Sequence, residues 1–282
     1  MQFSLNGRNI AAEPGETVLS VARKNGVFIP TLCHHDAVSP SGACRLCVVQ
    51  VSSGERSRIV SSCLYAPSEN DRVETDTERV RKVRRMVLEL LLARCPTVEL
   101  IRDLARAYGI QRSRFTDGAG PSEERCVLCG LCVRVCDEVV GRHAISHAKR
   151  GIQRKITTAF DTQADECIGC GACVRICPTG ALHYEDLPEQ KQPERVMVEL
   201  HTRVPLVRCS DCGRAFASPA LFEHVSKSVN VPPTTLAACP ACRSKSFAAT
   251  AAQNPPSAPA FARAHARTYQ SQLLASINEE SS

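Results

Sequence analysis

The sequence predicts an α+β protein built from several small modules that metal–thiolate centres hold together. Seventeen of its 282 residues are cysteine, none is tryptophan, and aromatic residues make up only 4% of the chain. A cysteine-rich segment at residues 126–136 recurs at 167–177. A chain with so few large apolar side chains does not build one large core, and small modules then need cross-links or metal to be stable.

The cysteines are expected to bind metal rather than to form disulfides. The N-terminus MQFSLNGRNI lacks the basic and apolar regions of a secretory signal, whereas disulfide frameworks belong to secreted proteins. The longest apolar run, residues 86–93, contains Glu89 and is much shorter than the roughly 20 residues that cross a bilayer. We therefore expect a cytoplasmic protein with no membrane span.

The formal net charge of +6 suggests an anionic partner, but it counts every cysteine as neutral. A centre with four thiolates around a core of about +2 carries about −2, so four such centres bring the loaded protein to about −2. The sequence therefore gives little support to nucleic-acid binding.

Residues 1–76 are expected to form a small module of strands and one helix. Apolar and polar residues alternate over residues 2–12 around Asn6-Gly7, which predicts a hairpin. A short helix capped by Glu16 or Thr17 and ending at Gly26 follows. Strands are expected at 48–51, 58–60 and 72–75.

The four cysteines of this module are predicted to hold a [2Fe-2S] cluster on a β-grasp-like scaffold. Cys44 and Cys47 form a close pair, with Cys33 and Cys63 as outlying ligands on either side. Plant-type ferredoxins share the close pair but differ in the first spacing. A structural zinc site is the alternative, and we interpret His34 and His35 as loop residues because four cysteines already suffice.

Residues 77–118 are expected to be a helical connector. Apolar residues recur at helical spacing over 77–94, beside a basic face of Arg79, Arg81, Lys82, Arg84 and Arg85. Pro96 ends this helix, and Thr97 is expected to cap a second one that runs to Tyr108. The basic face is expected to be solvated, with a docking surface for an acidic partner as the alternative. The lone Cys95 is expected to be a small buried apolar residue.

The repeat within residues 119–188 predicts a bacterial-type domain with two [4Fe-4S] clusters. In the C-x2-C-x2-C-x3-C pattern, three cysteines hold one cluster and the fourth holds the other. The first cluster is expected on Cys126, Cys129, Cys132 and Cys177, and the second on Cys167, Cys170, Cys173 and Cys136. Asp137 follows the first copy where proline is expected, whereas Pro178 follows the second. Eight zinc thiolates are the alternative, but zinc sites are usually built from paired knuckles.

Residues 189–248 contain two such knuckles and are expected to form a zinc ribbon. The ligands are Cys209, Cys212, Cys239 and Cys242, and a rubredoxin-like iron is the functional alternative to zinc. Residues 249–282 turn to Ala, Pro, Ser and Gln and are expected to be disordered. A partner-induced helix presenting Tyr269, Leu273 and Ile277 is the alternative.

The cysteine motifs resemble those of a known family. Pro30-Thr-Leu-Cys-His, Gly42-Ala-Cys-Arg-Leu-Cys-Val-Val and the two repeat segments are similar to the iron-sulfur part of the large complex I subunit. They are closer to the small diaphorase subunit of NAD-reducing hydrogenases, and they also resemble the N-terminus of NAD-linked formate dehydrogenases. The resemblance covers about residues 1–188, and the segment from Val207 to Arg243 resembles an extension of ferredoxin-like hydrogenase subunits.

The resemblance implies an electron-transfer subunit within a hetero-oligomeric oxidoreductase of the NAD(P)-linked hydrogenase or NADH dehydrogenase type. Family members often carry a further cluster on one histidine and three cysteines between the two modules. Here that stretch offers only Cys95 and no histidine, so the relay is expected to lack that cluster.

The chain also lacks a G-x-G-x-x-G motif after a strand, a P-loop and a Ser/His/Asp grouping, so no catalytic residues are expected. We expect it to relay single electrons between a flavin/NAD(P) subunit and a hydrogenase, with formate dehydrogenase as the second choice of partner. A redox-sensing regulator and a freestanding soluble ferredoxin are the alternatives.

Overall fold

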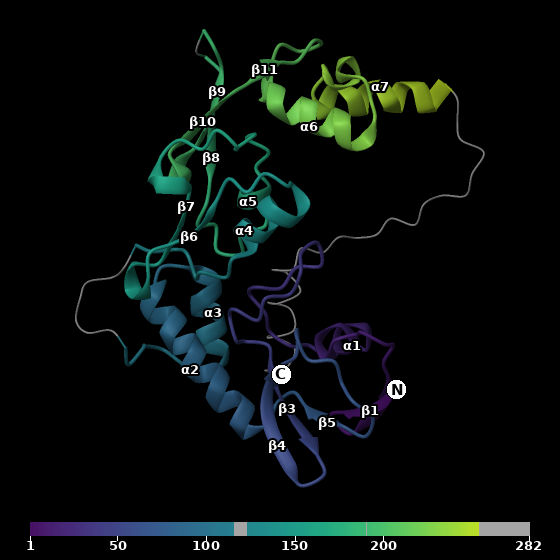
Figure 1. The fold of residues 1–282 in the computed structure, drawn as a ribbon, viewed down its shortest axis with the longest axis vertical. Helices are drawn as coiled ribbons and strands as arrows, with labels where there is room; N and C mark the ends of the chain where they lie inside the picture. Colours follow the sequence, from purple (N-terminus) through teal and green to yellow (C-terminus); the bar gives the residue numbers. More distant parts are fainter. Residues whose placement is uncertain (116–122, 190, 254–282) are drawn as a thin grey trace.

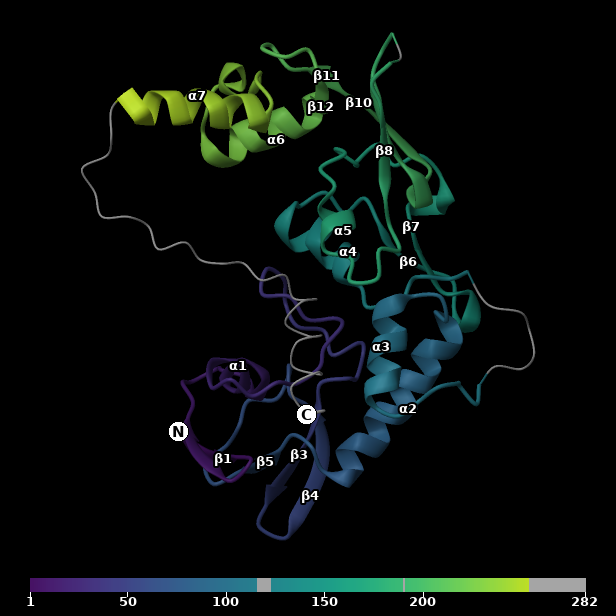
Figure 2. The same ribbon diagram turned by 180° about the vertical axis from the view of Figure 1, so that it is seen from behind.

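The computed structural model describes residues 1–115, 123–189 and 191–253. Its modules follow one another along the longest axis, in the order of the sequence (Figure 1). The N-terminal strands lie at the bottom, two long helices rise beside them, and the C-terminal helices lie at the top. The view from behind shows the same series (Figure 2).

The N-terminal module is built on one five-stranded sheet in the order β2-β1-β5-β3-β4. Its strands are β1 (Gln2–Leu5), β2 (Arg8–Ala11), β3 (Val48–Ser53), β4 (Arg56–Ser61) and β5 (Arg72–Glu74). The first strand pairs parallel with β5, and the other neighbours are antiparallel. The sheet therefore joins the start of the module to its end.

The predicted hairpin and first helix are both confirmed. Asn6 and Gly7 adopt positive φ values of 49° and 78°, as a tight two-residue turn between β1 and β2 requires. Helix α1 (Val18–Lys24) begins at Thr17, whose hydroxyl accepts the Ser20 backbone N–H at 3.2 Å. Its apolar side packs against the sheet, in a core that includes Cys47 and Cys63.

The connector consists of α2 (Glu78–Arg94) and α3 (Glu99–Ala107). Thr77 caps α2, and Cys95 ends it before Pro96. The prediction that Thr97 caps the second helix is wrong. Pro96 and Thr97 lie in a turn, and Val98, in an extended conformation, occupies the N-cap position without a side-chain hydrogen bond.

Arg84 does not belong to the solvated basic face that the sequence predicts. Its side chain is only 3% exposed and donates to the backbone carbonyls of Leu46 and Val48 and to the Tyr108 hydroxyl. Buried guanidinium groups are stable when their donors are satisfied, and here three acceptors converge. Arg84 thus fastens the connector to the chain between two N-terminal cysteines, Cys44 and Cys47, and to strand β3.

The repeat module consists of short helices and hairpins. In the first copy, α4 (Leu131–Arg134) runs into a π-helical turn, η1 (Val135–Val139); the second copy carries α5 (Ala172–Arg175). Between and after them lie β6 (Ser146–Ala148), η2 (Gly151–Gln153), β7 (Lys155–Thr157), η3 (Ala159–Asp161), β8 (Tyr184–Leu187), β9 (Glu194–Met197), η4 (Val198–Leu200) and β10 (Thr202–Pro205). The strands β10, β9 and β8 form an antiparallel sheet beside the second copy.

The C-terminal module combines one hairpin with helices. It contains β11 (Val207–Arg208), β12 (Ala215–Ala217), α6 (Pro219–Val229), η5 (Pro233–Leu236) and α7 (Pro240–Gln253). The first cysteine knuckle lies in the hairpin, but the second lies at the start of α7. Residues 249–253 of the expected tail continue α7, whereas residues 254–282, with Tyr269, Leu273 and Ile277, lie outside the described residues.

Candidate metal centres

The four N-terminal cysteines come together on the loop between α1 and β3 and the turn after β4. The Cys44 backbone N–H lies 3.4 Å from the Cys33 Sγ, and the Leu32 N–H lies at the same distance from the Cys44 Sγ. The Sγ atoms of Cys47 and Cys63 are 3.3 Å apart. All four thiols are free and buried, so the fold holds a sulfur quartet with backbone donors around it.

Contacts within this quartet separate the pKa values of its thiols. Hydrogen bonding from the Cys44 thiol lowers the pKa of Cys33 to about 5, and hydrogen bonding from Cys63 lowers that of Cys47 to about 6. The same contacts and burial raise the pKa values of Cys44 and Cys63. The site therefore favours negative charge on two sulfurs even without an ion, as a thiolate-bound metal requires.

The first repeat quartet lines one cavity of about 200 Å³. Cys126, Cys129, Cys132 and Cys177 all face it, together with the charged residues Glu124, Lys155 and Glu199. Burial raises the pKa of Cys129 to about 12 and also raises that of Cys132. The Ala181 backbone N–H donates to the Cys177 Sγ at 3.2 Å. Four sulfurs thus converge on a partly charged chamber.

The second repeat quartet lines a separate, narrower cavity of about 30 Å³. Cys136, Cys167, Cys170 and Cys173 face it, and the other lining side chains are mostly apolar, with Arg142 as the charged exception. Burial raises the pKa of Cys173 to about 12. Each cavity thus contains the four cysteines that the spacing groups together, including the one that crosses from the other copy.

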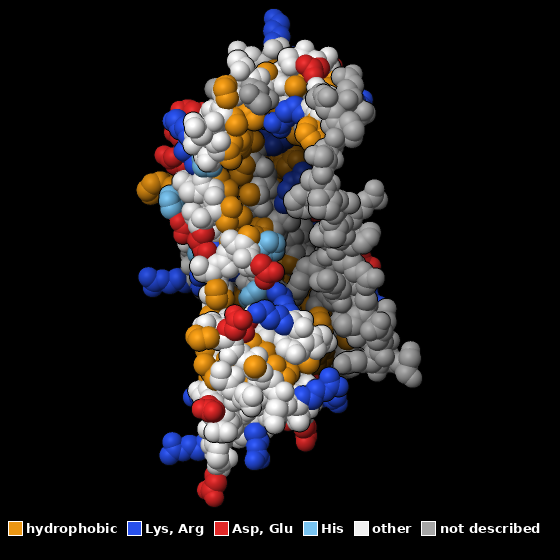
Figure 3. All heavy atoms as spheres, turned by 90° about the vertical axis from the view of Figure 1, so that its right-hand side faces the viewer, with side chains coloured by type: hydrophobic (Ala, Val, Ile, Leu, Met, Phe, Trp, Pro, Cys, Tyr) orange, Lys and Arg blue, Asp and Glu red, His pale blue; other side chains and the backbone are white. Residues whose placement is uncertain are grey.

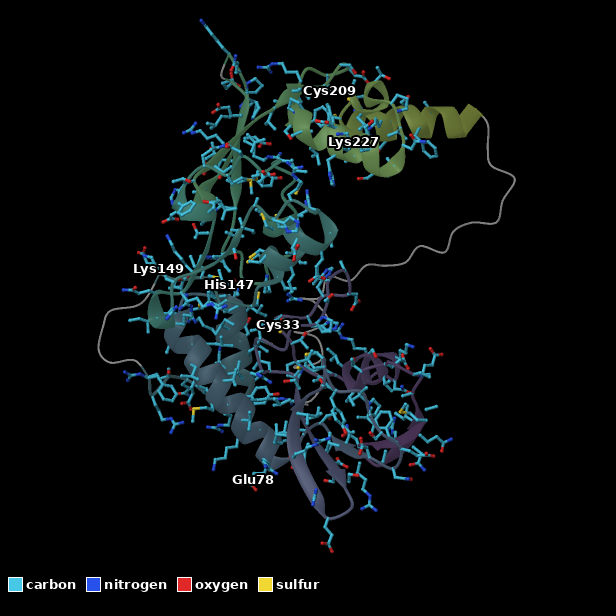
Figure 4. All side chains as sticks on the ribbon, in the orientation of Figure 1. Cys33, Glu78, His147, Lys149, Cys209 and Lys227 are labelled. Atoms are coloured by element: carbon cyan, nitrogen blue, oxygen red, sulfur yellow. The ribbon has the colours of Figure 1, made fainter. Side chains whose placement is uncertain are left out.

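Corresponding glycines open both short repeat helices. Gly130 and Gly171 each have a φ of 72°, a left-handed conformation that suits glycine. An added Cβ would lie 3.2 Å from the His147 Nε2 at Gly130 and 3.0 Å from the Tyr184 Cε1 at Gly171. An aromatic ring therefore packs against the backbone of each cysteine loop; Figure 4 shows His147 on the strand beside α4.

The C-terminal knuckles bring their four sulfurs together. The Sγ atoms of Cys209, Cys212, Cys239 and Cys242 all lie within 4.8 Å of one another. Backbone N–H groups of Asp211 and Cys239 point at the Cys209 Sγ, at 3.4 and 3.1 Å. The donor set and its spacing fit a tetrahedral metal ion. Figure 4 shows Cys209 at the top of the molecule, far from Cys33 at its middle.

The N-terminal quartet and the two repeat quartets lie next to one another along the long axis of the molecule. Cys33 and Cys129 belong to the same buried cluster, which also contains Leu88 and Ile101 of the connector. Cys132 and Cys173 belong to the next cluster, so each repeat quartet contributes to a shared core. The N-terminal site adjoins the first repeat site, which adjoins the second.

Several residues that the sequence did not single out hold the cysteine loops in place through hydrogen bonds to their backbone carbonyls. Arg134 donates to the Cys33 carbonyl, and Arg195 donates to the Gly169 carbonyl, both at 2.7 Å. Arg195 also forms a two-pronged pair with Asp186, and its guanidinium lies 4.0 Å from the Tyr184 ring centroid. Ser218 caps α6 and donates to the Ile168 carbonyl at 2.6 Å. The one signal in the sequence was Asp137, which stands where the repeat pattern has proline and indicated that the first copy has different surroundings.

Cys95 and the two loop histidines are not part of the quartets. Cys95 is fully buried in the connector core, where burial raises its pKa to about 12. His34 contacts Arg23, and the His35 Nδ1 accepts the Ala37 backbone N–H at 3.1 Å. These positions agree with the expected structural roles.

The surface gives a coarser division. On the face in Figure 3, hydrophobic side chains form a band over the upper half, and charged and histidine side chains gather at the waist. Among the described residues, no helix has the length and apolar character needed to cross a membrane.

Two family models match the chain. A 2Fe-2S iron-sulfur cluster binding domain matches residues 1–78, and a 4Fe-4S dicluster domain matches residues 125–181 and, a second time, 166–218. The matched regions contain the N-terminal and repeat quartets, which agrees with one 2Fe-2S domain and one dicluster domain.

Curated relatives are subunits of NADH-ubiquinone and NADH-quinone oxidoreductases. The chain is 29% identical over 181 residues to the mitochondrial NADH-ubiquinone oxidoreductase 78 kDa subunit of Candida albicans. It is 31% identical over 175 residues to the NADH-ubiquinone oxidoreductase 75 kDa subunit of Reclinomonas americana. The two matches cover 56% and 55% of this chain but only 25% of each relative, so the chain spans about a quarter of their length. A bacterial NADH-quinone oxidoreductase subunit, from Rhizobium meliloti, is also 31% identical, over 180 residues that make up 56% of this chain and 21% of that protein.

A solved structure matches more completely. It is a chain of an NAD+-reducing [NiFe]-hydrogenase in the H2-reduced state, with 33% identity and a TM-score of 0.54. The match covers 64% of this chain and 85% of the hydrogenase chain. The chain therefore belongs to the family of iron-sulfur electron-transfer subunits that is represented in NADH-quinone oxidoreductases and in NAD+-reducing hydrogenase.

Proposed function

We propose that this chain relays single electrons between a flavin- and NAD(P)-binding subunit and a hydrogenase catalytic subunit in a cytoplasmic complex. A formate dehydrogenase subunit is the second choice of catalytic partner. The observation that carries the proposal is the series of three adjoining sulfur quartets. The 33% identity to a chain of an NAD+-reducing hydrogenase supports hydrogenase as the first choice.

Each quartet fits the cluster proposed for it. Cys33, Cys44, Cys47 and Cys63 would hold a [2Fe-2S] cluster; Cys126, Cys129, Cys132 and Cys177 a first [4Fe-4S] cluster; and Cys167, Cys170, Cys173 and Cys136 a second. The thiols are free, and each set converges on one place. Bound iron-sulfur clusters supply reversible one-electron oxidation and reduction.

The residues around the quartets favour transfer along the series. The connector packs Leu88 and Ile101 into the same buried core as Cys33 and Cys129, so apolar side chains surround the first two sites. Cys132 of the first repeat site and Cys173 of the second belong together to the next buried core. The proposed relay has no cluster on the connector, where Cys95 is the lone cysteine.

The different residues around the two repeat sites would separate their reduction potentials. Glu124, Lys155 and Glu199 line the first cavity, whereas the charged side chain that lines the second is that of Arg142. A change in cluster charge interacts with these groups. Solvent exposure and hydrogen bonds to sulfur are main determinants of cluster potential. We therefore expect the two sites to differ in reduction potential.

We propose zinc for the C-terminal quartet of Cys209, Cys212, Cys239 and Cys242. Paired knuckles are the usual zinc arrangement, and zinc has no redox chemistry. The Ser218 hydroxyl connects this module to the Ile168 carbonyl in the second cysteine loop. The module then stabilises that loop and offers a surface for complex assembly.

Anaerobic purification tests the proposal. The protein should contain about ten irons and about ten acid-labile sulfides per chain, with one zinc. Dithionite reduction should give EPR signals from one [2Fe-2S] and two [4Fe-4S] clusters. An iron content near four, or no EPR signal, would contradict the assignment.

A native pull-down tests the partners. A flavoprotein together with a nickel-containing subunit supports the hydrogenase complex, whereas a molybdenum-containing subunit supports the formate dehydrogenase complex. Recovery of the chain as a monomer without partners contradicts both.

A further inference from the structure

The loop that carries Cys33, Ser39 and Cys44, called the [2Fe-2S] loop below, contacts the first repeat helix through two charged side chains. Arg134 on α4 donates through Nη2 to the Cys33 carbonyl at 2.7 Å and through Nη1 to the Ser39 carbonyl. Glu138 on η1 accepts the Ser39 backbone N–H at 2.6 Å. Two residues of one helix thus hold two points of a loop about a hundred positions earlier in the chain.

The place of Arg134 gives these contacts their importance. Arg134 lies between Cys132 and Cys136, which face the two different repeat cavities. Its partner carbonyl belongs to Cys33, a member of the N-terminal quartet. Arg134 is therefore a near neighbour in sequence of cysteines from both repeat sites, and its side chain is hydrogen-bonded to the backbone of a cysteine of the N-terminal site.

The chemistry of the contact favours one fixed geometry. A guanidinium is planar and presents its donors in a rigid fork, so two simultaneous carbonyl partners define both distance and orientation. Hydrogen bonds that involve a charged group contribute roughly ten- to a hundredfold to an equilibrium. With Glu138 as a third point, the loop is held against both translation and rotation.

The second copy of the repeat has no such junction. Its corresponding residue, Arg175, is exposed. Pro178 follows Cys177 there, whereas Asp137 lets the first copy continue through the π-helical turn η1 that carries Glu138. The junction is thus a feature of the first copy and not a general consequence of the cysteine pattern.

We propose that Arg134 and Glu138 are positioning residues that fix the separation between the N-terminal quartet and the first repeat quartet for electron transfer. This inference rests on the proposed function. The step between the two sites moves one electron in either direction, so that one site is oxidised and the other reduced, with no bond formed or broken. Efficient transfer needs a short and constant separation, which the two side chains provide.

Two measurements on the anaerobic full-length protein test the inference. Pulsed dipolar EPR of the dithionite-reduced protein gives the distance distribution between the [2Fe-2S] and first [4Fe-4S] centres. Hydrogen exchange gives the protection of the Ser39 amide, which depends directly on Glu138. The variants are Arg134→Gln and Glu138→Ala, with Arg175→Gln as the matched control from the second copy.

We expect both variants to broaden the distance distribution and to speed Ser39 exchange by roughly tenfold or more. Arg175→Gln should change neither quantity, and Arg134→Lys, which keeps the charge but not the fork, should broaden the distribution. A merely structural role of Arg134 in the repeat would alter iron content without altering the distance between loaded sites.

Unchanged distances and unchanged Ser39 protection in both variants would overturn the inference. If Arg134→Gln fails to take up iron, Glu138→Ala decides by the same two measurements, because Glu138 is exposed and lines neither cavity. Failure of the proposed function itself is distinguishable, since the unaltered protein would then lack the cluster signals.

Discussion

The two copies of the cysteine repeat have the same ligand spacing but different surroundings. Each begins its short helix at a left-handed glycine and contributes three cysteines to one cavity and one to the other. The first copy continues into η1 and contacts the [2Fe-2S] loop. The second ends its helix at Arg175, before Pro178, and its cysteine loop is held by Arg195 and by Ser218 of the C-terminal module. The spacing determines which cysteines share a cavity, whereas single substitutions in the repeat determine which segments contact each site.

One residue accounts for much of this difference. Proline has no backbone N–H, and it disfavours helical conformation in the residue before it, so Pro178 prevents the second helix, which ends at Arg175, from continuing as the first does. Asp137 has no such restriction. The Val140 N–H reaches the Val135 carbonyl at 3.0 Å, the wide spacing of a π-helical turn. A single residue difference between the copies, with no insertion, thus gives the first copy an additional contact surface.

The largest expected effect comes from removing corresponding ligands. We expect Cys129→Ala and Cys170→Ala each to lose about four irons. Cys129→Ala should also isolate the [2Fe-2S] centre, because the first site lies between it and the second. Cys170→Ala should leave exchange between the first two sites intact. Iron analysis and freeze-quench EPR measure both effects.

Equal loss of exchange between the [2Fe-2S] and first [4Fe-4S] centres in the two variants would contradict this serial order. The paired design controls for general instability, since both variants remove one thiol from equivalent positions.

The next effect comes from making the first copy like the second. Asp137→Pro should destabilise the protein by about 3 kcal/mol, the typical penalty for proline inside a helix. It should also expose the Ser39 amide, because η1 would no longer present Glu138. Chemical denaturation and hydrogen exchange provide the two measurements.

The reverse change, Pro178→Asp, is the control. It should leave Ser39 protection unaltered, since the second copy does not touch that loop. If Asp137→Pro retains both full stability and Ser39 protection, the proline rule does not explain the difference between the copies.

Alanine at the two left-handed glycines should have smaller and unequal effects. The left-handed conformation alone costs alanine about 1–2 kcal/mol. Gly171→Ala should exceed Gly130→Ala, because its Cβ would meet a Tyr184 ring that Arg195 holds in place, at the shorter distance. Thermal denaturation of the loaded variants gives the comparison.

Gly141→Ala isolates the backbone contribution, because Gly141 has a φ of 65° and nothing within 4 Å of the added carbon. Equal destabilisation in all three variants would mean that the rings yield freely and do not constrain the cysteine loops.

The smallest expected effect is that of Cys95→Ala. We expect a loss of about 1 kcal/mol from the lost packing and no loss of iron. The Cys95 thiol should also resist alkylation at pH 8 in the folded protein, since burial raises its pKa to about 12 and leaves it protonated. Denaturation and iron analysis check both points, and a loss of iron would make Cys95 a ligand that the repeat pattern does not reveal.

The sequence predicts the local parts of this structure well. The Asn6-Gly7 hairpin, the Thr17 and Thr77 caps and the grouping of each repeat quartet depend on a few neighbouring residues or on a repeated spacing. The connector's Val98 cap was missed because a capping residue one position away had the better side chain. Pro96 and Thr97 lie in a turn that delays the start of the helix by one residue, and side-chain preference alone does not reveal such a shift.

Long-range contacts could not be predicted in the same way. Arg84 resembles its exposed basic neighbours in sequence, yet it is buried because the carbonyls of Leu46 and Val48 lie within its reach. Arg134 and Arg175 occupy the same repeat position, and only the folded structure separates the bonded residue from the exposed one. Nothing in the pattern indicated that the second C-terminal knuckle would open a helix.

The Ser218 hydroxyl has a consequence for the order of biosynthesis. It lies 50 residues after the Ile168 carbonyl to which it donates, so a nascent chain cannot form this hydrogen bond to the second cysteine loop until residue 218 has left the ribosome. The N-terminal sheet, in contrast, closes when β5 pairs with β1, within the first 75 residues. Maturation can therefore start at the N-terminal domain while the later loops are still being synthesised.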